Sequence, residues 1–558
     1  MSVRSVWVTV LDRLAAAGVR HAFGLPGDDM GLLVAAQQCG IEVHLCRDQR
    51  HAAYQATAHA VLGGGLGVAF VGKGPAVTHA ATGILEAREQ NAPLVLLTSG
   101  VPADRLATGA FQELDAVAVL APLTVWQGRV EDPAQAAVLT AEAVAKALEY
   151  RGPVVLEVPE TIGLTDAGEQ STEPEVVEVS RQLRLPSTAA DHASRPVLLV
   201  GGGARHSIAP GALETMAESM GAGIMCTASG RGLVDEAHPL FVGVSGLYAP
   251  APARELLERC DLIIALGSAL EETATYSWPE PAPPVLSVTT TPPKKHSPAR
   301  WVLRADAGEV VDIWSSRWSG HRPTRNSAWV EMVRDARRRI DTDGDTVRDE
   351  SATAAGQAPG IVGLLATIDS VVPRDRISLH ENGLQDMWSY FFPFWTVPAE
   401  ADCLVPSEQT PLGFGVASVL GVATARPNRP VVVFAGDGAF DAAATELPSL
   451  ARHEGPVLIV VLRNGGFGWL EVNARSLDTP VPHSFLDTAQ GRGDLCRARG
   501  VAYVGCDRSD QVLEAVQRAW ALARSGHPCV LEVGVSLSDV PPGMEALAGD
   551  FPALEPTS

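Results

Sequence analysis

Short runs of apolar, largely β-branched residues recur along the chain and alternate with alanine-rich segments. The runs are apolar throughout, which is typical of strands buried on both faces of a parallel sheet. Because strand and helix patterns alternate, we predict an α/β fold of doubly wound parallel-sheet domains. The runs lie at residues 65–72, 93–100, 153–160, 196–203, 261–268, 430–438, 456–464 and 528–535.

Two stretches interrupt this pattern and predict where the domains are divided. Residues 166–195 are polar and acidic, and residues 319–360 are polar or charged, so both are typical of linkers or peripheral segments. A chain of 558 residues has room for three or four domains of about 150 residues each. We therefore expect three domains, at residues 1–165, 190–318 and 355–540. The similar strings PVVLE (153–157) and PCVLE (528–532) are consistent with related first and third sheets.

Charge and cysteine usage exclude several classes of protein. The net charge is −22, which disfavours binding to nucleic acid or to an anionic membrane. The eight cysteines form no CxxC pair, so we expect reduced, mostly buried thiols rather than disulfides or a zinc site. The N-terminal pattern is amphipathic, and the apolar runs are shorter than the ~20 residues of a membrane span. We therefore expect a cytoplasmic protein.

Two glycine-rich turns in the third domain carry the strongest chemical signal. One strand runs into GDGAF (436–440), and the next runs into RNGGFG (463–468). Asp437 and Asn464 are 464 − 437 = 27 residues apart, which suits one parallel strand–helix–strand unit of about 30 residues. Both turns would then lie at the carboxyl edge of one sheet. Since Mg²⁺ favours one or two carboxylates plus phosphate oxygens, the pair predicts a magnesium-bound diphosphate rather than two ordinary turns.

These turns resemble those of thiamine-diphosphate enzymes of the acetolactate synthase and 2-oxo-acid decarboxylase superfamily. The resemblance covers nearly the whole chain. It includes HAFGLPG (21–27), FQE (111–113), GLVD (232–235) and HPLFVG (238–243). It implies three domains, namely a pyrimidine-binding, a central and a diphosphate-binding domain.

The resemblance also implies thiamine diphosphate and Mg²⁺ as cofactors. Asp437, Asn464 and the carbonyl of Gly466 would bind the metal. The usual Asn-Asn pair is Arg463-Asn464 here, which keeps the metal-binding second position. Leu412 stands where a bulky apolar residue bends the cofactor into a V shape, although it could also be a core leucine before a helix. The other expected cofactor contacts are Gly436, Gly438, Ala439, Phe440, Phe467, Asn382 and Gly383.

One expected acid is missing from the first domain. The family segment reads Arg-(His/Asp)-Glu-x-x-Ala-Ala, and here Gln49 stands in place of the glutamate that bonds the pyrimidine N1′. An amide can hydrogen-bond this nitrogen but cannot titrate. Asp48 is adjacent, but its side chain is expected to point elsewhere. Either the enzyme works without the acid, as glyoxylate carboligase does, or ordinary turnover is lost. We favour a working enzyme in which Gln49 slows cofactor activation.

Three further residues of the first domain are catalytic candidates. Asp28 matches the acid after the FGxPG turn of pyruvate decarboxylase-type enzymes, but it could equally be a helix N-cap. His79 stands where related loops carry asparagine, and it could face the substrate or be structural. Gln112 belongs to the FQE turn, which replaces the paired histidines of those decarboxylases and favours a carboligase.

Taken together, these features predict an enzyme that acts on a small 2-oxo acid. It would decarboxylate this substrate and transfer the acyl-anion equivalent to an acceptor, as acetolactate synthase does. One alternative is a 2-oxo-acid decarboxylase that releases an aldehyde without oxidation. Another is a catalytically impaired, cofactor-binding subunit. The resemblance implies active sites between subunits, hence a homodimer or homotetramer.

Overall fold

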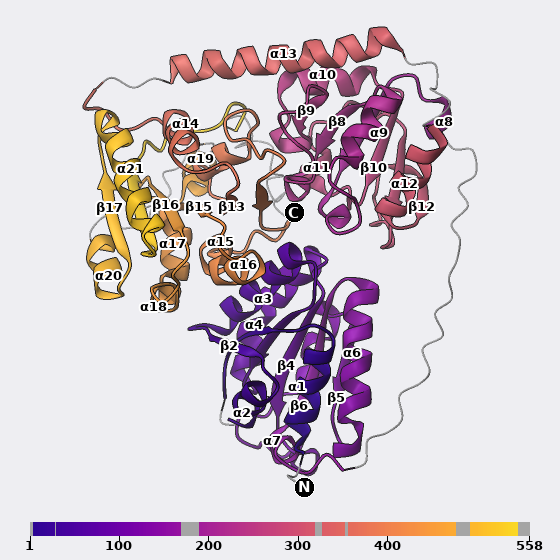
Figure 1. Ribbon diagram of the computed structural model, residues 1–558, viewed down its shortest axis with the longest axis vertical. Helices are drawn as coiled ribbons and strands as arrows, with labels where there is room; N and C mark the ends of the chain where they lie inside the picture. Colours follow the sequence, from indigo (N-terminus) through magenta and orange to yellow (C-terminus); the bar gives the residue numbers. More distant parts are fainter. Residues whose placement is uncertain are drawn as a thin grey trace, which may run out of the picture. The chain divides into compact units, whose positions relative to one another are not determined.

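The computed structural model describes residues 4–27, 30–168, 189–318, 326–351, 355–475 and 491–544. Within them the chain forms three six-stranded sheets, with helices between successive strands (Figure 1). Every pairing between the named strands is parallel. The prediction of three parallel α/β sheets is therefore confirmed.

The first sheet has the strand order β2-β1-β3-β4-β6-β5. Its strands are β1 (His21–Leu25), β2 (Glu42–Leu45), β3 (Gly67–Val71), β4 (Leu94–Gly100), β5 (Trp126–Arg129) and β6 (Pro153–Pro159). Its helices are α1 (Val6–Ala16), α2 (Gly31–Gln38), α3 (Gln49–Gly63), α4 (Pro75–Glu89), α5 (Ala116–Leu120), α6 (Ala136–Tyr150) and α7 (Glu160–Gly163). The central strands β3, β4 and β6 are buried along their whole length, as the uninterrupted apolar runs require.

The second sheet has the order β12-β11-β10-β7-β8-β9. Its strands are β7 (Pro196–Val200), β8 (Gly223–Cys226), β9 (Phe241–Val244), β10 (Leu262–Leu266), β11 (Val285–Thr289) and β12 (Ala299–Arg304). Its helices are α8 (Ala189–His192), α9 (Ala212–Met220), α10 (Ala251–Arg259), α11 (Glu272–Thr275) and α12 (Ala307–Trp318), followed by α13 (Ser327–Glu350). This order is that of a Rossmann-type sheet. Helix α13 fills much of the predicted linker 319–360, and Arg337 ties it to carbonyls around β9.

The third sheet has the order β14-β13-β15-β16-β18-β17. Its strands are β13 (Ile377–His380), β14 (Asp402–Leu404), β15 (Val431–Gly436), β16 (Val457–Arg463), β17 (Ala502–Cys506) and β18 (Cys529–Gly534). Its helices are α14 (Ile361–Val371), α15 (Phe414–Ala417), α16 (Val419–Ala425), α17 (Asp437–Ala443), α18 (Leu447–Leu450), α19 (Gly468–Arg475), α20 (Arg492–Ala498) and α21 (Val512–Arg524), with a 3₁₀ turn η7 (Asp386–Tyr390).

The first and third sheets have the same topology, since each follows the order 2-1-3-4-6-5 when its strands are numbered from its own first strand. The two similar strings found in the sequence fall on β6 and β18, which hold the same place in the two sheets. The strand order reverses between β13 and β15 in the third sheet. Doubly wound sheets bind ligands at the carboxyl edge beside such a reversal.

Contacts divide the chain into two compact units. Unit 1 contains residues 1–181, 409–428 and 443–453, and unit 2 contains residues 182–408, 429–442 and 454–558. Unit 1 therefore combines the first sheet with α15, α16 and α18, whereas unit 2 holds the second and third sheets.

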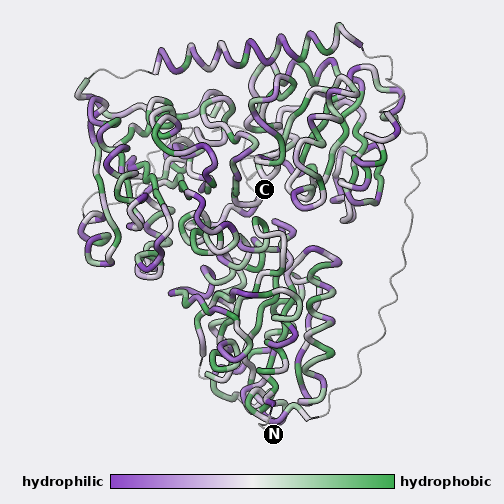
Figure 2. Tube along the Cα trace, viewed as in Figure 1, coloured by the Kyte–Doolittle hydropathy of each residue, from purple (hydrophilic) through white to green (hydrophobic). Residues whose placement is uncertain are grey.

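The apolar cores are built from the strands and from the helix faces packed on them. Figure 2 shows hydrophobic stretches recurring along the chain in every domain. All eight cysteines are free, and all except the half-buried Cys39 are buried, as the sequence predicts. No helix of the described residues is long and apolar enough to cross a membrane.

Candidate active site

The two glycine-rich turns of the third domain lie side by side at the carboxyl edge of its sheet. Strand β15 pairs with β16 in parallel, and Gly436 at the end of β15 is in register with Leu462. Helix α17 begins at Asp437, directly after its strand, while Asn464 follows the last residue of β16. The strand–helix–strand unit inferred from the sequence therefore brings both residues to one edge of the sheet. Its elements β15, α17 and β16 are labelled in Figure 1.

Backbone hydrogen bonds hold the two turns together. The Asp437 carboxylate accepts from the N–H of Gly438 and, across the turns, from the N–H of Gly465, both at 3.0 Å. The Asn464 side-chain oxygen accepts from the N–H of Gly466 at 2.8 Å. Each of these oxygens retains a second lone pair. The arrangement offers two hard oxygen donors at the end of adjacent strands.

Asp437 is a buried carboxylate, with 1% of its surface exposed. Burial raises the pKa of Asp437, and the Gly465 N–H and the Arg492 guanidinium oppose this rise. Arg492 cannot neutralise Asp437 fully, because it forms a two-bond ion pair with Asp441 at 2.7–2.8 Å. A carboxylate desolvated in this way gains most from a cation bound directly to it. The donor set and its burial therefore fit a small divalent ion such as Mg²⁺.

Two further polar residues of this edge, Gln385 and Asp386, were missed in the sequence. The Asn464 amide donates to the Gln385 side-chain oxygen at 2.6 Å, and the Gln385 amide donates to the Leu537 carbonyl at 3.0 Å. Gln385 thus fixes which atom of Asn464 is the donor and leaves its oxygen on the side of Gly466. In the sequence the pair follows the polar stretch 380–383 after one leucine, and nothing separates it from an ordinary loop.

Asp386 is buried beside Gly383 and Gly436. Neither carboxylate oxygen meets a donor at hydrogen-bonding geometry among the described residues. Burial raises the pKa of Asp386 to about 7, the charge of Asp437 adds to this rise, and the N–H groups of Gly383 and Gly436 offset it only in part. A second buried carboxyl group therefore stands next to the candidate metal site.

The other cofactor-binding candidates of this domain surround the same edge. Asn382 and Gly383 follow β13, and the Asn382 carbonyl accepts from the Trp469 indole at 3.2 Å. Ala439 and Phe440 are buried in the first turn of α17, so only their backbone can face a ligand there. The remaining candidates, Gly436, Gly438, Gly466 and Phe467, flank the two turns. The part each residue takes in binding stays a prediction.

Gln49 is the first residue of α3 in unit 1 and is half-buried. Asp48 is the N-cap of this helix, and its carboxylate accepts from the Arg50 N–H at 2.8 Å and from the Arg50 guanidinium at 3.2 Å. Asp48 is thus engaged in capping the helix, as expected for a side chain that points away from Gln49.

Leu412 also belongs to unit 1, in the loop before α15, and 52% of its surface is exposed. It is therefore not a core leucine. Helices α15 and α16 pack on α3. The rings of Phe414 and Tyr54 meet at 5.4 Å, and a Cβ on Gly421 would overlap the carbonyl of Gln55. The loop of Leu412 and the helix that begins at Gln49 thus belong to one packed body.

Two other first-domain candidates, His79 and Gln112, lie around the start of α4. His79 is exposed in the second turn of this helix, so it is not a buried core histidine. Gln112 is exposed and has a φ of 55°, and its backbone packs against Gly74, the N-cap of α4. The Glu113 carboxylate orders the turn by accepting from the N–H groups of Ala107, Gly109 and Ala110. Asp28 lies outside the described residues.

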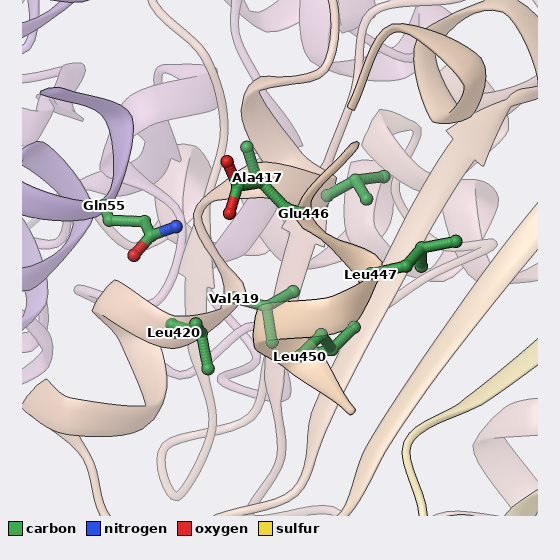
Figure 3. Close-up of a pocket in the computed structure, with 8 residues that line it drawn as sticks. Gln55, Ala417, Val419, Leu420, Glu446, Leu447 and Leu450 are labelled. Atoms are coloured by element: carbon green, nitrogen blue, oxygen red, sulfur yellow. The ribbon is translucent and has the colours of Figure 1, made fainter. Parts of the chain in front are cut away.

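A buried polar cluster supports the start of α3. Glu446 accepts from the Arg47 N–H at 2.7 Å and contacts the His51 imidazole at 3.1 Å. Beside it lies a small cavity, in which the centre of a water molecule can move within about 10 Å³. This is roughly the space that one water molecule needs. Figure 3 shows the Gln55 amide and the Glu446 carboxylate turned toward each other across it. Glu446 thus fixes the loop that leads to Gln49.

Comparison with known protein families agrees with this geometry. Three domains described for thiamine pyrophosphate enzymes match in order along the chain. The N-terminal TPP binding domain matches residues 5–119, the central domain residues 189–312 and the C-terminal TPP binding domain residues 383–533. The chain belongs to the thiamine pyrophosphate enzymes. Thiamine pyrophosphate is thiamine diphosphate, so the two TPP binding domains imply this cofactor, and the resemblance seen in the sequence is confirmed.

The chain is also similar to acetolactate synthase large subunits. It is 28% identical to that of Parasynechococcus marenigrum, over 96% of this chain and 89% of the relative. It is 28% identical to the isozyme 2 large subunit of Escherichia coli, over 82% and 83%. It is 26% identical to a probable large subunit of Methanocaldococcus jannaschii, over 96% and 93%. The chain is thus a thiamine pyrophosphate enzyme that is distantly related to these synthases over nearly its full length.

Proposed function

We propose that this thiamine pyrophosphate enzyme is a Mg²⁺-dependent carboligase of the acetolactate synthase kind. It would decarboxylate a small 2-oxo acid and join the remaining acyl-anion equivalent to an aldehyde or ketone. The proposal rests on one observation above all, the pair of oxygen donors that Asp437 and Asn464 bring to adjacent strand ends. The relationship to acetolactate synthases over 96% of the chain supports the choice of reaction.

The residues of unit 2 provide for the metal and the diphosphate. Asp437, Asn464 and the Gly466 carbonyl would bind Mg²⁺, with Gln385 orienting the Asn464 amide. The glycines at 436 and 438 would let phosphate oxygens approach the backbone, whereas the Asp386 carboxylate fills the space beside Gly383. Bound thiamine diphosphate supplies the thiazolium carbon that adds to the ketone and the electron sink for loss of CO₂.

The residues of unit 1 provide for the reactive part of the cofactor. Leu412, exposed before α15, would support the bend of the cofactor. Gln49 would hydrogen-bond the pyrimidine, but its amide cannot take up or release a proton at this position. In a family whose active sites lie between subunits, these residues would complete the site of a second copy, so we propose a homodimer or homotetramer.

Product analysis tests the reaction. The protein is incubated with thiamine diphosphate, Mg²⁺ and a panel of 2-oxo acids that includes pyruvate, with and without an added aldehyde or ketone acceptor. A carboligase gives a hydroxy-ketone product whose yield depends on the acceptor. An aldehyde formed equally with and without acceptor identifies the decarboxylase instead, and Asp437→Asn is the control for cofactor-dependent turnover.

A second candidate, a cofactor-binding subunit with impaired turnover, is favoured by the amide of Gln49, which stands where the family carries a glutamate. This candidate predicts saturable binding of thiamine diphosphate and Mg²⁺ with no turnover of any acid in the panel. Measurement of cofactor binding and of products on the same preparation separates it from the carboligase.

A further inference from the structure

Two histidines and a glutamate gather at one edge of the first sheet, apart from the residues assigned to the cofactor. His21 on β1 is in register with Glu42 on the edge strand β2, and His44 stands two residues further along β2. Residues two apart on a strand point to the same face, and register partners do so as well. The three side chains therefore converge on one face of the sheet.

Their ligand atoms are spaced as a metal site requires. The His21 Nδ1 lies 3.0 Å from the His44 Nε2 and 3.5 Å from one Glu42 oxygen, and the His44 Nε2 lies 3.9 Å from the other oxygen. Ligands about 2.0–2.2 Å from a tetrahedral Zn²⁺ stand about 3.3–3.6 Å from one another. The observed separations bracket this value, so the spacing of the three ligand atoms is compatible with binding one ion.

Both imidazoles are held in place by aromatic neighbours. The His44 ring stacks on Phe23 at 5.0 Å, and the His21 ring meets the His59 ring edge-on at 5.5 Å. His59 itself is engaged at Nδ1 with the Thr424 hydroxyl at 2.9 Å. Burial lowers the pKa of His21 and of His44, although Glu42 opposes this in both cases. Neutral imidazoles in fixed orientations are what a metal ion binds.

We propose that His21, His44 and Glu42 bind a divalent transition-metal ion, with Zn²⁺ as the reference ion. Two imidazoles and one carboxylate suit Zn²⁺ better than Mg²⁺, which prefers oxygen ligands and is assigned here to Asp437. The Glu42 side chain is 67% exposed, so the ion has access from solvent and keeps a coordination position for water or a small anion. The ion would also fasten the edge strand β2 to β1.

A hydrogen bond between the two imidazoles is the competing explanation of the 3.0 Å contact. Such a bond needs one protonated and one bare nitrogen and makes no demand on Glu42. Metal binding instead needs all three side chains, so removal of the exposed carboxylate distinguishes the two explanations. Glu42→Gln is suited to this purpose because it alters an exposed side chain that the fold does not bury.

The test is equilibrium dialysis of the full-length protein, with thiamine diphosphate and Mg²⁺ present, against buffered Zn²⁺. We expect one equivalent of Zn²⁺ whose affinity falls in Glu42→Gln and His44→Gln by at least the roughly 10–100-fold typical of losing an outer-shell partner. His527→Gln, which removes an exposed histidine of unit 2, is the matched control and keeps the affinity. Thermal unfolding of each variant confirms that it is folded.

Co²⁺ provides a second readout, because its visible absorption reports the coordination geometry directly. A tetrahedral spectrum is expected for the unaltered protein and for His527→Gln, and its loss is expected for Glu42→Gln. The proposal is overturned if no equivalent of Zn²⁺ is bound, or if Glu42→Gln and His44→Gln bind it as tightly as the unaltered protein.

Discussion

Replacement of Gln49 by glutamate most directly tests the proposed role of this residue at the pyrimidine of the cofactor. Gln49 opens α3, where the helix N-terminus favours a negative side chain by about 0.3–1 kcal/mol. At about 1.36 kcal/mol per pKa unit, this lowers the pKa of the introduced carboxyl by about 0.2–0.7. The variant Gln49→Glu therefore carries a carboxylate at neutral pH and is at least as stable as the parent protein.

A group that can titrate at this position should speed activation of the cofactor. Positioned acid–base groups typically contribute about 10²–10⁴-fold to a proton-transfer step. We expect the exchange of the C2 proton of bound thiamine diphosphate to rise by about this factor in Gln49→Glu. The measurement is deuterium exchange at C2 by rapid quench and NMR, at saturating cofactor and Mg²⁺.

Asp48→Asn is the matched control, because asparagine caps a helix as well as aspartate does and removes the neighbouring carboxylate. Its exchange rate should equal that of the parent protein. Equal rates in Gln49→Glu and the parent would show that Gln49 does not touch the cofactor, and a slow Asp48→Asn would assign the acid to Asp48.

Three further predictions concern unit 2. Asp437→Asn should weaken Mg²⁺-dependent binding of thiamine diphosphate at least about tenfold, because a charged metal ligand is lost; Asp510→Asn, which alters an exposed ion pair with Arg508, should bind normally in the same titration calorimetry. Arg231→Met should lower the free energy of unfolding by about 3–5 kcal/mol, because it leaves the buried Glu236 without its ion-pair partner. In urea denaturation, the double variant Arg231→Met/Glu236→Leu should recover part of this lost stability. In the metal-free protein, burial raises the pKa of Asp386 from 3.8 to about 7, so between these values the folded state holds a proton that the unfolded state has lost. The free energy of unfolding should therefore fall as the pH rises from about 4 to 7, by at most about 4 kcal/mol. Asp386→Asn should flatten that dependence in chemical denaturation, and an unchanged slope would assign it to other groups.

The features predicted correctly from the sequence depend on short stretches of chain. The central strands of the three sheets follow from uninterrupted apolar runs, which predict β3, β4, β6, β7, β10, β15, β16 and β18. The meeting of the Asp437 and Asn464 turns follows from one strand–helix–strand unit. The features that were missed depend on packing between distant segments. Glu446 and His51 are 395 residues apart in sequence, and no local pattern indicates which helices will bring them together. The His21–His44 contact requires the register of β1 on β2, which alternation alone does not set.

The two departures from the family pattern differ in how the surrounding structure accommodates them. Arg463, which replaces the first residue of the Asn-Asn pair, donates to Glu532 at 2.8 Å and also pairs with Asp507, both on the β17–β18 side of the sheet. Its charge is thereby satisfied, and Asn464 keeps its contacts with Gly466 and Gln385. Gln49 has no such compensation, because the adjacent Asp48 is engaged as the helix cap. The candidate metal-binding edge thus keeps its geometry despite its substitution, whereas under the proposed function the substitution at Gln49 would change the proton-transfer chemistry available to the cofactor. A difference in mechanism from the acetolactate synthases should accordingly appear in the proton-transfer step and not in metal affinity.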